Sequence, residues 1–352
     1  MKIGIVGSGS WGTALAFSMA KNQNNDITMW SRNADTVQNI NENHKNSSCF
    51  NNVLLPSNIT ATLHLKEIIL YDIIFIVIPV MSVESIVKKL SNLGLKNDTL
   101  FISCSKGIEN NNLQFVSKII TGIVPNEVAV LSGPNLATEV IDSKYWFTNI
   151  GFSSTVNDNT KYFNKLSSII NSIFKYDNMN IEYVDNQELL EFYGAMKNVL
   201  ALIIGFVKGL NCGENFVAAV FTMLLQEINF LSSHILNIAY KNEITNILSY
   251  GAIGDTVLTC YTRKSRNMNY GFELAQCNDF VSYTKQNKNL IEGLSTLRSI
   301  EKIINSNNIN KCNISTIMLV IDIILHNVGD KNNFAQHILN NKRSKVYQSV
   351  AL

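Results

Sequence analysis

The sequence has no C-x-x-C pair and no grouping of Cys and His at metal-binding spacing. Its cysteines are far apart along the chain: Cys49, Cys104, Cys212, Cys260, Cys277 and Cys312. Paired cysteines stabilise small secreted domains, and closely spaced Cys and His residues hold structural zinc. Because both patterns are missing, we expect reduced thiols, no metal site and a cytoplasmic protein.

Long runs of one charge are also missing. Charged residues make up 16% of the 352 residues, and the formal net charge is only +2. A nucleic-acid-binding surface needs clustered Lys and Arg. We therefore expect no nucleic-acid partner, although a compact anionic metabolite needs only a few local cations.

No uninterrupted apolar run is long enough for a membrane helix. The N-terminal run stops at Gly7, and the run at residues 199–207 is bounded by Lys197 and Lys208. A helix that crosses a bilayer needs roughly 20 apolar residues. We expect neither a signal peptide nor a membrane span.

The length and the residue pattern predict two domains. Short β-rich runs alternate with helical stretches in the first half, at residues 2–6, 26–30, 73–78, 99–103, 128–131 and 148–152. Long helical patterns dominate later, at residues 187–210, 214–240, 293–304 and 314–327. We predict an α/β fold with a doubly wound, mainly parallel Rossmann sheet in residues 1–184, and an all-α domain in residues 185–352. The boundary is expected near residues 178–186, beside the polar segment 177–180.

A glycine-rich turn follows the first predicted strand. Gly7-Ser8-Gly9-Ser10-Trp11-Gly12 leads into a helical pattern at residues 13–20. In this context the glycines allow a tight turn, a close approach of pyrophosphate and close packing of helix on strand. The amides at the start of the helix then face the phosphates. The segment predicts dinucleotide binding, and a glycine turn without a ligand is the alternative.

The end of the second predicted strand bears on the choice of cofactor. An acid is expected here if the site binds the ribose 2′-hydroxyl of NAD. The sequence has Ser31-Arg32-Asn33 instead. An arginine tolerates a 2′-phosphate better than an acid does, so Arg32 favours NADP(H) over NAD(H). The alternative is that Arg32 is merely solvated.

Polar turns follow two later strands. Lys106 comes after the strand at residues 99–103, and Gly133-Pro134-Asn135 comes after the strand at residues 128–131. Ligands bind at the carboxyl edge of an open parallel sheet. By spacing alone, however, a solvated lysine and a helix cap at Asn135 are the more ordinary interpretations.

The second half contains two further polar groupings. In the segment 194–200, Lys197 and Asn198 lie within one helical turn of Gly194 and have many apolar neighbours. Burial lowers a lysine pKa from about 10.4 towards neutrality, which favours a role as proton acceptor. Asp255, Thr259 and the segment 265–267 would suit a phosphorylated polyol, or else form an ordinary surface loop.

Taken together, these segments resemble NAD(P)-dependent glycerol-3-phosphate dehydrogenase. Seven stretches match in the family's order: GSGSWGTALA at the start, SKGIE, LSGPNLATEV, GAMKNVLALIIGFVKGLNCGEN, GAIGDTVLTC, SRN and EG at 292–293. The resemblance implies hydride exchange between sn-glycerol 3-phosphate and dihydroxyacetone phosphate with NAD(P), as a source of glycerol 3-phosphate for glycerophospholipids. It also implies a 6-phosphogluconate-dehydrogenase-like helical domain and a homodimer.

The resemblance further implies roles for individual residues. Lys197 would be the proton acceptor, with Lys106 and Asp255 as the other catalytic groups. The cofactor would contact Gly7, Gly9, Ser10, Trp11, Gly12, Arg32, Lys106, Ala137, Arg266, Leu290 and Glu292. The substrate would contact Lys106, Gly133, Asn135, Lys197, Asn198, Asp255, Thr259, Ser265, Arg266 and Asn267. Asn135 departs from the family pattern, because bacterial relatives usually have Thr or Ser there.

Two other functions stay open at this point. Another β-hydroxyacid-type dehydrogenase would also place a Gly-x-x-Lys helix in an all-α second domain. A dinucleotide-binding sensor without catalysis is the other, although Lys197 and Asp255 are intact. A lactate-type enzyme is disfavoured, because none of the five histidines lies in a motif.

Overall fold

The computed structural model describes residues 1–153, 156, 158–236, 247–262, 264–277, 280, 283 and 291–340. The chain divides into two compact units. Unit 1 comprises Met1–Phe192 and Ser249–Asp255, and unit 2 comprises Tyr193–Leu248 and Thr256–Leu352. The division falls inside a helix, and a short stretch from the later half of the chain belongs to unit 1.

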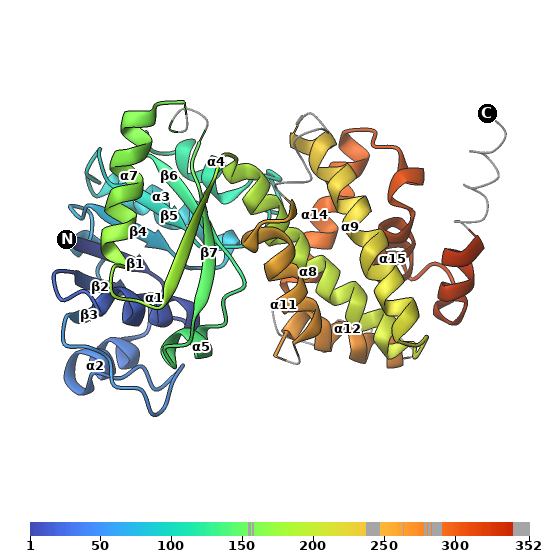
Figure 1. The fold of residues 1–352 in the computed structure, drawn as a ribbon, viewed down its shortest axis with the longest axis horizontal. Coiled ribbons are helices and arrows are strands. Elements are labelled where there is room, and N and C mark those ends of the chain that lie inside the picture. Colours follow the sequence, from blue (N-terminus) through green and yellow to red (C-terminus); the bar gives the residue numbers. More distant parts are fainter. Residues whose placement is uncertain are drawn as a thin grey trace. The chain divides into compact units, whose positions relative to one another are not determined.

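Unit 1 is built on an eight-stranded sheet of order β3-β2-β1-β4-β5-β6-β7-β8 (Figure 1). The strands are β1 (Lys2–Val6), β2 (Asp26–Trp30), β3 (Ile59–Thr62), β4 (Ile73–Ile76), β5 (Leu100–Ser103), β6 (Val128–Ser132), β7 (Trp146–Gly151) and β8 (Met179–Val184). All neighbouring strands run parallel except β6 and β7. The order reverses between β1 and β4, as in doubly wound nucleotide-binding folds, which confirms the predicted fold class.

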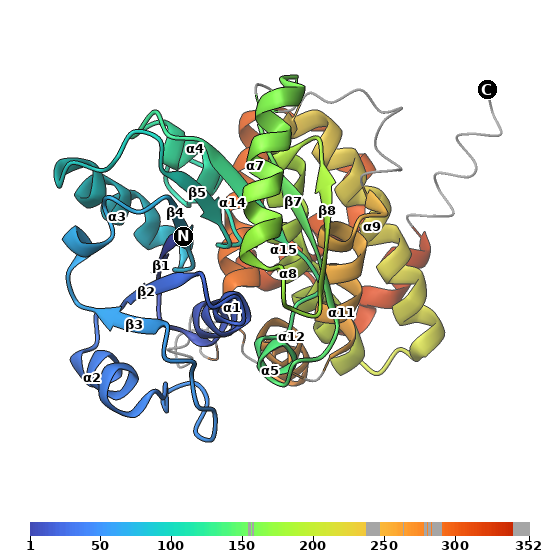
Figure 2. The same ribbon diagram turned by 60° about the vertical axis from the view of Figure 1, so that its left-hand side comes forward.

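Helices cover both faces of this sheet. They are α1 (Ser10–Ala20), α2 (Ala34–Asn43), α3 (Val80–Asn92), α4 (Val116–Thr121), α5 (Ala137–Ile141) and α7 (Thr160–Ile173), with a 3-10 turn η1 (Leu65–Glu67). Figure 2 shows α1 and α3 on opposite sides of the strands β1 and β4. The strands are therefore interior elements, as their unbroken apolar sequences predicted.

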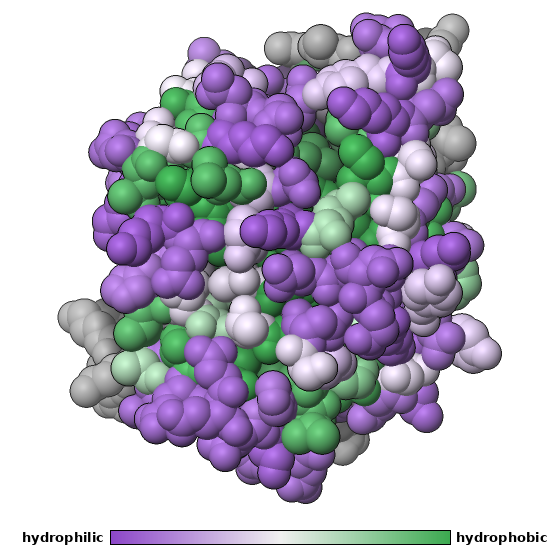
Figure 3. All heavy atoms as spheres, turned by 90° about the vertical axis from the view of Figure 1, so that its left-hand side faces the viewer, coloured by the Kyte–Doolittle hydropathy of each residue, from purple (hydrophilic) through white to green (hydrophobic). Residues whose placement is uncertain are grey.

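The face of unit 1 drawn in Figure 3 is mainly polar. Figure 3 looks onto the side that lies at the left in Figure 1, and it shows hydrophilic surface interrupted by separate apolar patches. Exposed large apolar side chains of unit 1 include Leu54, Leu63, Leu70 and Leu93. Scattered apolar residues of this kind are ordinary on globular proteins and indicate no function by themselves.

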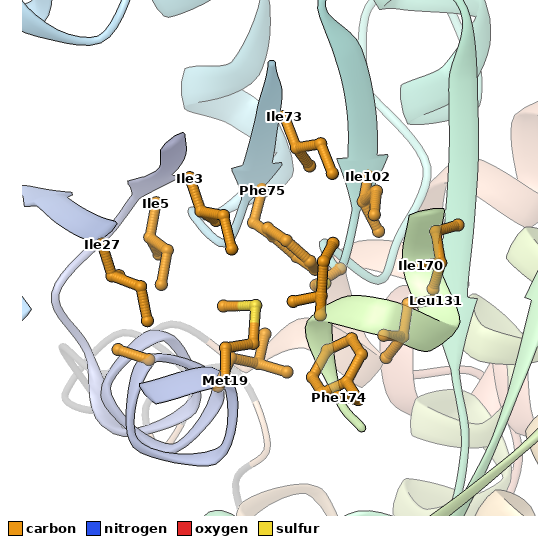
Figure 4. Packing of buried hydrophobic residues seen from close by; sticks show 14 of the residues in the cluster. Ile3, Ile5, Met19, Ile27, Ile73, Phe75, Ile102, Leu131, Ile170 and Phe174 are labelled. Atoms are coloured by element: carbon orange, nitrogen blue, oxygen red, sulfur yellow. The ribbon is translucent and has the colours of Figure 1, made fainter. Parts of the chain in front are cut away.

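The core of unit 1 has two layers, one on each face of the sheet, because the side chains along each strand alternate between the two faces. In β4, Ile73 and Phe75 belong to the cluster that α1 and α7 cover, where Met19 and Ile170 meet them (Figure 4). Ile74 and Ile76 belong to the opposite cluster, with the apolar residues of α3 and α4. Because successive side chains of a strand point to opposite faces, each strand contributes to both cores.

The polar segment at residues 177–180, beside the expected boundary, belongs to unit 1. The side chain of Asp177 is buried and accepts hydrogen bonds from Ser18 Oγ and Lys21 Nζ, each at 2.5 Å, and from Trp146 Nε1 at 2.8 Å. Strand β8 begins at Met179. The segment thus fastens the last strand of the sheet to α1 and β7, because a buried carboxylate needs several donors.

The described part of unit 2 is helical, as predicted. Its elements are α8 (Gln187–Gly209, which begins in unit 1), α9 (Glu214–Leu236), α11 (Asp255–Tyr261), α12 (Arg266–Gln276), α14 (Glu292–Ser306), α15 (Ser315–His326), η4 (Lys311–Ile314) and η5 (Lys331–Asn333). The predicted helix at residues 214–240 is α9 as far as Leu236, and residues 237–240 lie outside the described residues. Glu227 of α9 is buried and accepts the backbone N–H groups of Thr316 and Ile317, each at 2.9 Å.

Two helices are long and apolar enough to cross a membrane by composition, α8 and α9. In the most apolar stretch of α8, 94% of the residues are buried inside the structure, and in α9 39% are. The buried residues of α9 include Val217, Leu224, Ile228 and Leu231, which lie on one helical face. Helix α8 is therefore a core helix, and α9 contributes one face to a core.

Candidate active site

The turn after β1 requires its glycines. Gly7 has a φ of +125°, and a Cβ on it would lie 2.3 Å from the carbonyl oxygen of Val77. A Cβ on Gly12 would lie 2.2 Å from the carbonyl oxygen of Gly7. Around an added Cβ on Gly9, by contrast, no atom lies within 4 Å. The turn is closely packed on the sheet side and open on the side where a pyrophosphate would approach.

A hollow of about 440 Å³ opens beside this turn. It is lined by Gly7, Ser8, Gly9, Trp30, Ser31, Arg32, Asn33, Val77, Ile78 and Pro79. These residues follow or end β1, β2 and β4, where the strand order reverses and where doubly wound sheets bind nucleotides. Gly9 precedes α1 and provides no side-chain cap for its first amides. The residues present therefore fit a dinucleotide.

The end of β2 carries no carboxylate. Ser31 Oγ accepts hydrogen bonds from Ser8 Oγ at 2.7 Å and from the Asn33 N–H at 3.2 Å. Asn33 caps α2 by accepting the Thr36 N–H at 3.1 Å. Arg32 is exposed between them. Its guanidinium is therefore available at the rim of the hollow.

Other residues predicted at the cofactor site lie near the start of helices. Ser10 is exposed as the first residue of α1, and Ala137 is half-buried as the first residue of α5. Trp11 is half-buried, and its ring meets that of Trp146 edge to face at 5.9 Å. Leu290, also predicted here, lies outside the described residues.

Lys106 and Asp255 form an ion pair within unit 1. Lys106 Nζ lies 2.5 Å from Asp255 Oδ2 and 3.4 Å from the carbonyl oxygen of Gly133. The side chain of Asp255 is 2% exposed, and that of Lys106 is 21% exposed. The structure thus brings together three predicted site residues from separate segments. Cys104 is buried beside them, and burial raises the pKa of its thiol to about 12, so it stays protonated.

Near the carboxyl ends of β5 and β6, buried side-chain oxygens have no hydrogen-bond partner. Asn135 Nδ2 donates to the carbonyl of Phe147 at 2.8 Å, which leaves Asn135 Oδ1 buried without a partner. Ser103 Oγ and Ser132 Oγ, at the ends of the two strands, are also buried without a partner. Such atoms are costly unless a ligand or water satisfies them. The sequence prediction missed both serines, although their positions at strand ends were a usable signal.

In unit 2, three predicted site residues form one network. Asn267 Nδ2 donates to Asn198 Oδ1 at 2.9 Å, and Asn198 Nδ2 donates to Glu292 Oε2 at 3.0 Å. Asn267 Oδ1 accepts the Gly293 N–H at 2.9 Å. Since Glu292 only accepts when ionised, these bonds fix the orientation of both amides. The network links α8, α12 and α14.

The remaining predicted residues lie on α8, on α11 and at the start of α12. Lys197 is half-buried on α8, and its neighbours Met196 and Asn198 are buried. Ser265 caps α12 by accepting the Met268 N–H at 3.3 Å, and Arg266 is the exposed first residue of that helix. Thr259 is half-buried in α11.

Two family models match this chain in its two halves. The N-terminal model of NAD-dependent glycerol-3-phosphate dehydrogenase matches residues 2–159, and the C-terminal model matches residues 189–332. The chain belongs to this family. The family membership confirms the resemblance in the motifs and identifies the dinucleotide that fits the glycine turn as NAD(P).

Individual relatives agree with this assignment. The NAD(P)+ glycerol-3-phosphate dehydrogenase of Neorickettsia sennetsu is 31% identical over 307 residues, which cover 87% of this chain and 85% of the relative. That of Staphylococcus epidermidis is 32% identical over 305 residues, covering 85% of this chain and 87% of the relative. The crystal structure of glycerol-3-phosphate dehydrogenase from Coxiella burnetii superposes with a TM-score of 0.81 at 25% identity, covering 96% of this chain and 98% of the other.

Proposed function

We propose that this chain interconverts sn-glycerol 3-phosphate and dihydroxyacetone phosphate with NAD(P). The observation that carries the proposal is the Lys106–Asp255 ion pair beside the Gly133 carbonyl, in the same unit as the open glycine turn. A paired cation beside unsatisfied hydroxyl and amide oxygens suits a substrate with several oxygens.

In this mechanism the glycine turn holds the cofactor. The amides at the start of α1 and the open side of Gly9 receive the pyrophosphate. Arg32 pairs with a 2′-phosphate, so NADPH is the preferred reductant. The cofactor, when bound there, would supply hydride chemistry at C2 of the substrate.

Proton transfer at the C2 oxygen is assigned to Lys197. In the oxidation, the neutral amine takes the hydroxyl proton, and in the reduction the ammonium returns it. The Lys106 cation would stabilise negative charge on a substrate oxygen, and Asp255 keeps that cation in place. Asn135 Oδ1 accepts a substrate hydroxyl.

The phosphate of the substrate is assigned to the start of α12. Arg266 offers a guanidinium fork, which binds phosphate oxygens bidentately. The positive end of the helix dipole and the side-chain amide of Asn267 would also attract the phosphate. Asn267 is itself oriented by Asn198 and by Gly293.

We further propose that the enzyme is a cytoplasmic homodimer that supplies glycerol 3-phosphate for glycerophospholipid synthesis. Family membership supports the supply role, and the composition supports the location. The dimer is proposed by analogy with the family.

The test is to follow oxidation of NADPH and of NADH with dihydroxyacetone phosphate. We expect turnover with both and a higher kcat/KM with NADPH. As controls, glycerol 3-phosphate, 6-phosphogluconate and 3-hydroxyisobutyrate are offered with the oxidised cofactors. Turnover of either of the last two, with none of glycerol 3-phosphate, would establish another β-hydroxyacid dehydrogenase. Cofactor binding without any turnover would establish a sensor.

A further inference from the structure

Asn149 links the sheet of unit 1 to the segment that carries Asp255. It lies in β7, is fully buried, and accepts the Gly251 N–H on Oδ1 at 2.6 Å. On its other side, Asn149 Nδ2 donates to Glu182 of β8, to the carbonyl oxygen at 3.2 Å and to Oε2 at 2.8 Å. The sequence motifs gave no indication of this residue.

The Glu182 contacts determine which way the amide points. A backbone carbonyl and an ionised carboxylate both accept hydrogen bonds only, so they require the NH₂ group of Asn149. The carbonyl oxygen of the amide is thereby directed at the Gly251 N–H. Neither aspartate nor a hydrophobic residue can make both sets of bonds at this position.

The segment held by Asn149 is a short π-helix, η3 (Tyr250–Gly254). A Cβ on Gly251 would lie 2.3 Å from Leu190 Cδ1 and 2.8 Å from the Ser132 carbonyl oxygen, so the backbone of η3 lies directly against the end of β6. Asp255 follows η3, and its N–H is bonded to the carbonyls of Tyr250 and Ala252. Single π-turns are rare and are frequent at functional sites.

We propose that Asn149 is a positioning residue for the dehydrogenase reaction, because it fixes η3 and through η3 the carboxylate of Asp255 against Lys106. This inference rests on the proposed function, in which that ion pair stabilises negative charge on a substrate oxygen. Asn149 acts through the Gly251 N–H and touches neither substrate nor cofactor. Its effect is on the geometry of a catalytic pair whose members come from different segments of the chain.

The first experiment removes the amide and compares it with a matched control. Asn149→Ala is expected to lower kcat for dihydroxyacetone phosphate on the order of 10- to 100-fold, the cost of a small misplacement of catalytic groups, with KM for NADPH unchanged. Asn126 is the matched control, because it too is a buried asparagine that bonds backbone. Its Nδ2 donates to the carbonyls of Lys96, Asn97 and Thr99. Asn126→Ala should reduce thermal stability and leave kcat unchanged. Equal kcat in the two variants would overturn the inference.

The second experiment is a rescue by exchange of polarity. Asn149→Asp keeps an acceptor for Gly251 but faces the Glu182 carboxylate without a donor, so kcat should fall. Adding Glu182→Gln supplies an amide donor to the new carboxylate, while the bond to the backbone carbonyl of residue 182 is not remade. The double variant should therefore recover part of the kcat that Asn149→Asp loses. A double variant no faster than Asn149→Asp would contradict the proposal.

Crystal structures of the variants give a readout that does not depend on turnover. The Asp255 carboxylate should leave Lys106 Nζ in Asn149→Ala and return in the double variant. An unchanged ion pair in Asn149→Ala overturns the inference even if kcat falls. Absence of turnover by the wild type with either cofactor would overturn the proposed function instead, so the two failures are distinguishable.

Discussion

Lys106 and Asp255 are separated by 149 residues in the sequence, yet their side chains meet at 2.5 Å in unit 1. The carboxylate is almost completely buried, and a buried charge is stable only with a partner. The pair therefore joins a loop after β5 to the start of α11. Any change to one member alters the charge that the other presents.

Removing the negative charge of this pair should impair catalysis. Asp255→Asn keeps the size of the side chain but leaves the Lys106 ammonium without its counter-ion. We expect kcat to fall by at least about 100-fold, a loss typical of a displaced charge-stabilising group. The control is Asp72→Asn, since Asp72 pairs with Lys96 on the surface and should not affect turnover. The kcat of both variants is measured by steady-state kinetics at saturating cofactor. A near-normal kcat in Asp255→Asn would remove the ion pair from the mechanism.

The assignment of Lys197 is tested by its truncation. Lys197→Ala should lower turnover by at least about 100-fold, the scale of a lost general base, while NADPH still binds. Lys208→Ala on the same helix is the matched control. Cofactor binding is measured by fluorescence titration. Wild-type turnover in Lys197→Ala would refute its role as proton acceptor.

Arg266 is expected to act in substrate binding. Arg266→Ala should raise KM for dihydroxyacetone phosphate about 10- to 100-fold, because a charged hydrogen bond to phosphate contributes about 1.5–3 kcal/mol. Arg298→Ala, which removes an exposed arginine of α14, should leave KM unchanged. If both variants keep the KM of the wild type, the phosphate binds elsewhere.

Arg32 is expected to select the cofactor. Arg32→Asp replaces a partner for the 2′-phosphate with an acceptor for the 2′-hydroxyl. The ratio of kcat/KM for NADPH over NADH should fall by at least about tenfold, which corresponds to about 1.4 kcal/mol. Parallel assays with the two reduced cofactors measure it. An unchanged ratio would show that Arg32 is only solvated.

The raised pKa of Glu191 predicts that the stability of the protein depends on pH. It is buried on α8 and accepts hydrogen bonds from the N–H and Oγ of Ser117, and burial raises its pKa from 4.5 to about 7. In the unfolded chain the carboxyl ionises above pH 4.5, whereas in the folded protein it stays protonated up to about pH 7. Its contribution to the free energy of unfolding is therefore complete below pH 4.5 and is lost as the pH rises to about 7.

Glu191→Gln removes this titration, because an amide is neutral at every pH. Relative to the wild type, the variant should gain stability as the pH rises between these two pKa values, by roughly 3 kcal/mol at most. Urea unfolding at a series of pH values measures the difference. A difference that stays constant across this range would contradict the raised pKa.

The sequence predicted elements wherever apolar runs or glycine turns were local signals. β1, β4 and α8 follow from such runs, and the turn at residues 7–12 follows from its glycines. β3 and β8 were missed, because Ile-Thr-Ala-Thr and Met-Asn-Ile-Glu-Tyr-Val contain too many polar residues to resemble buried strands. Both are edge strands of the sheet, where one side of the strand needs no partner.

The site shows a similar limit. The positions of Lys106 and Asp255 followed from family motifs, but their pairing is a long-range contact that spacing does not encode. Asn149 was missed for the same reason, since it is an ordinary polar residue in an apolar strand. Its role depends on its hydrogen bond to Gly251, which comes about a hundred residues later, so it becomes visible only when the chain is folded.

The return of Ser249–Asp255 to unit 1 limits how this protein can be divided experimentally. A fragment that ends at Phe192 would keep the glycine turn and all eight strands but would lack the aspartate that neutralises Lys106. Gene truncation at the apparent domain border therefore separates dinucleotide capture from charge stabilisation. A recombinant nucleotide-binding fragment would need η3 and Asp255 grafted back before it could report on the charge balance at Lys106, and it would still lack Lys197 and Arg266.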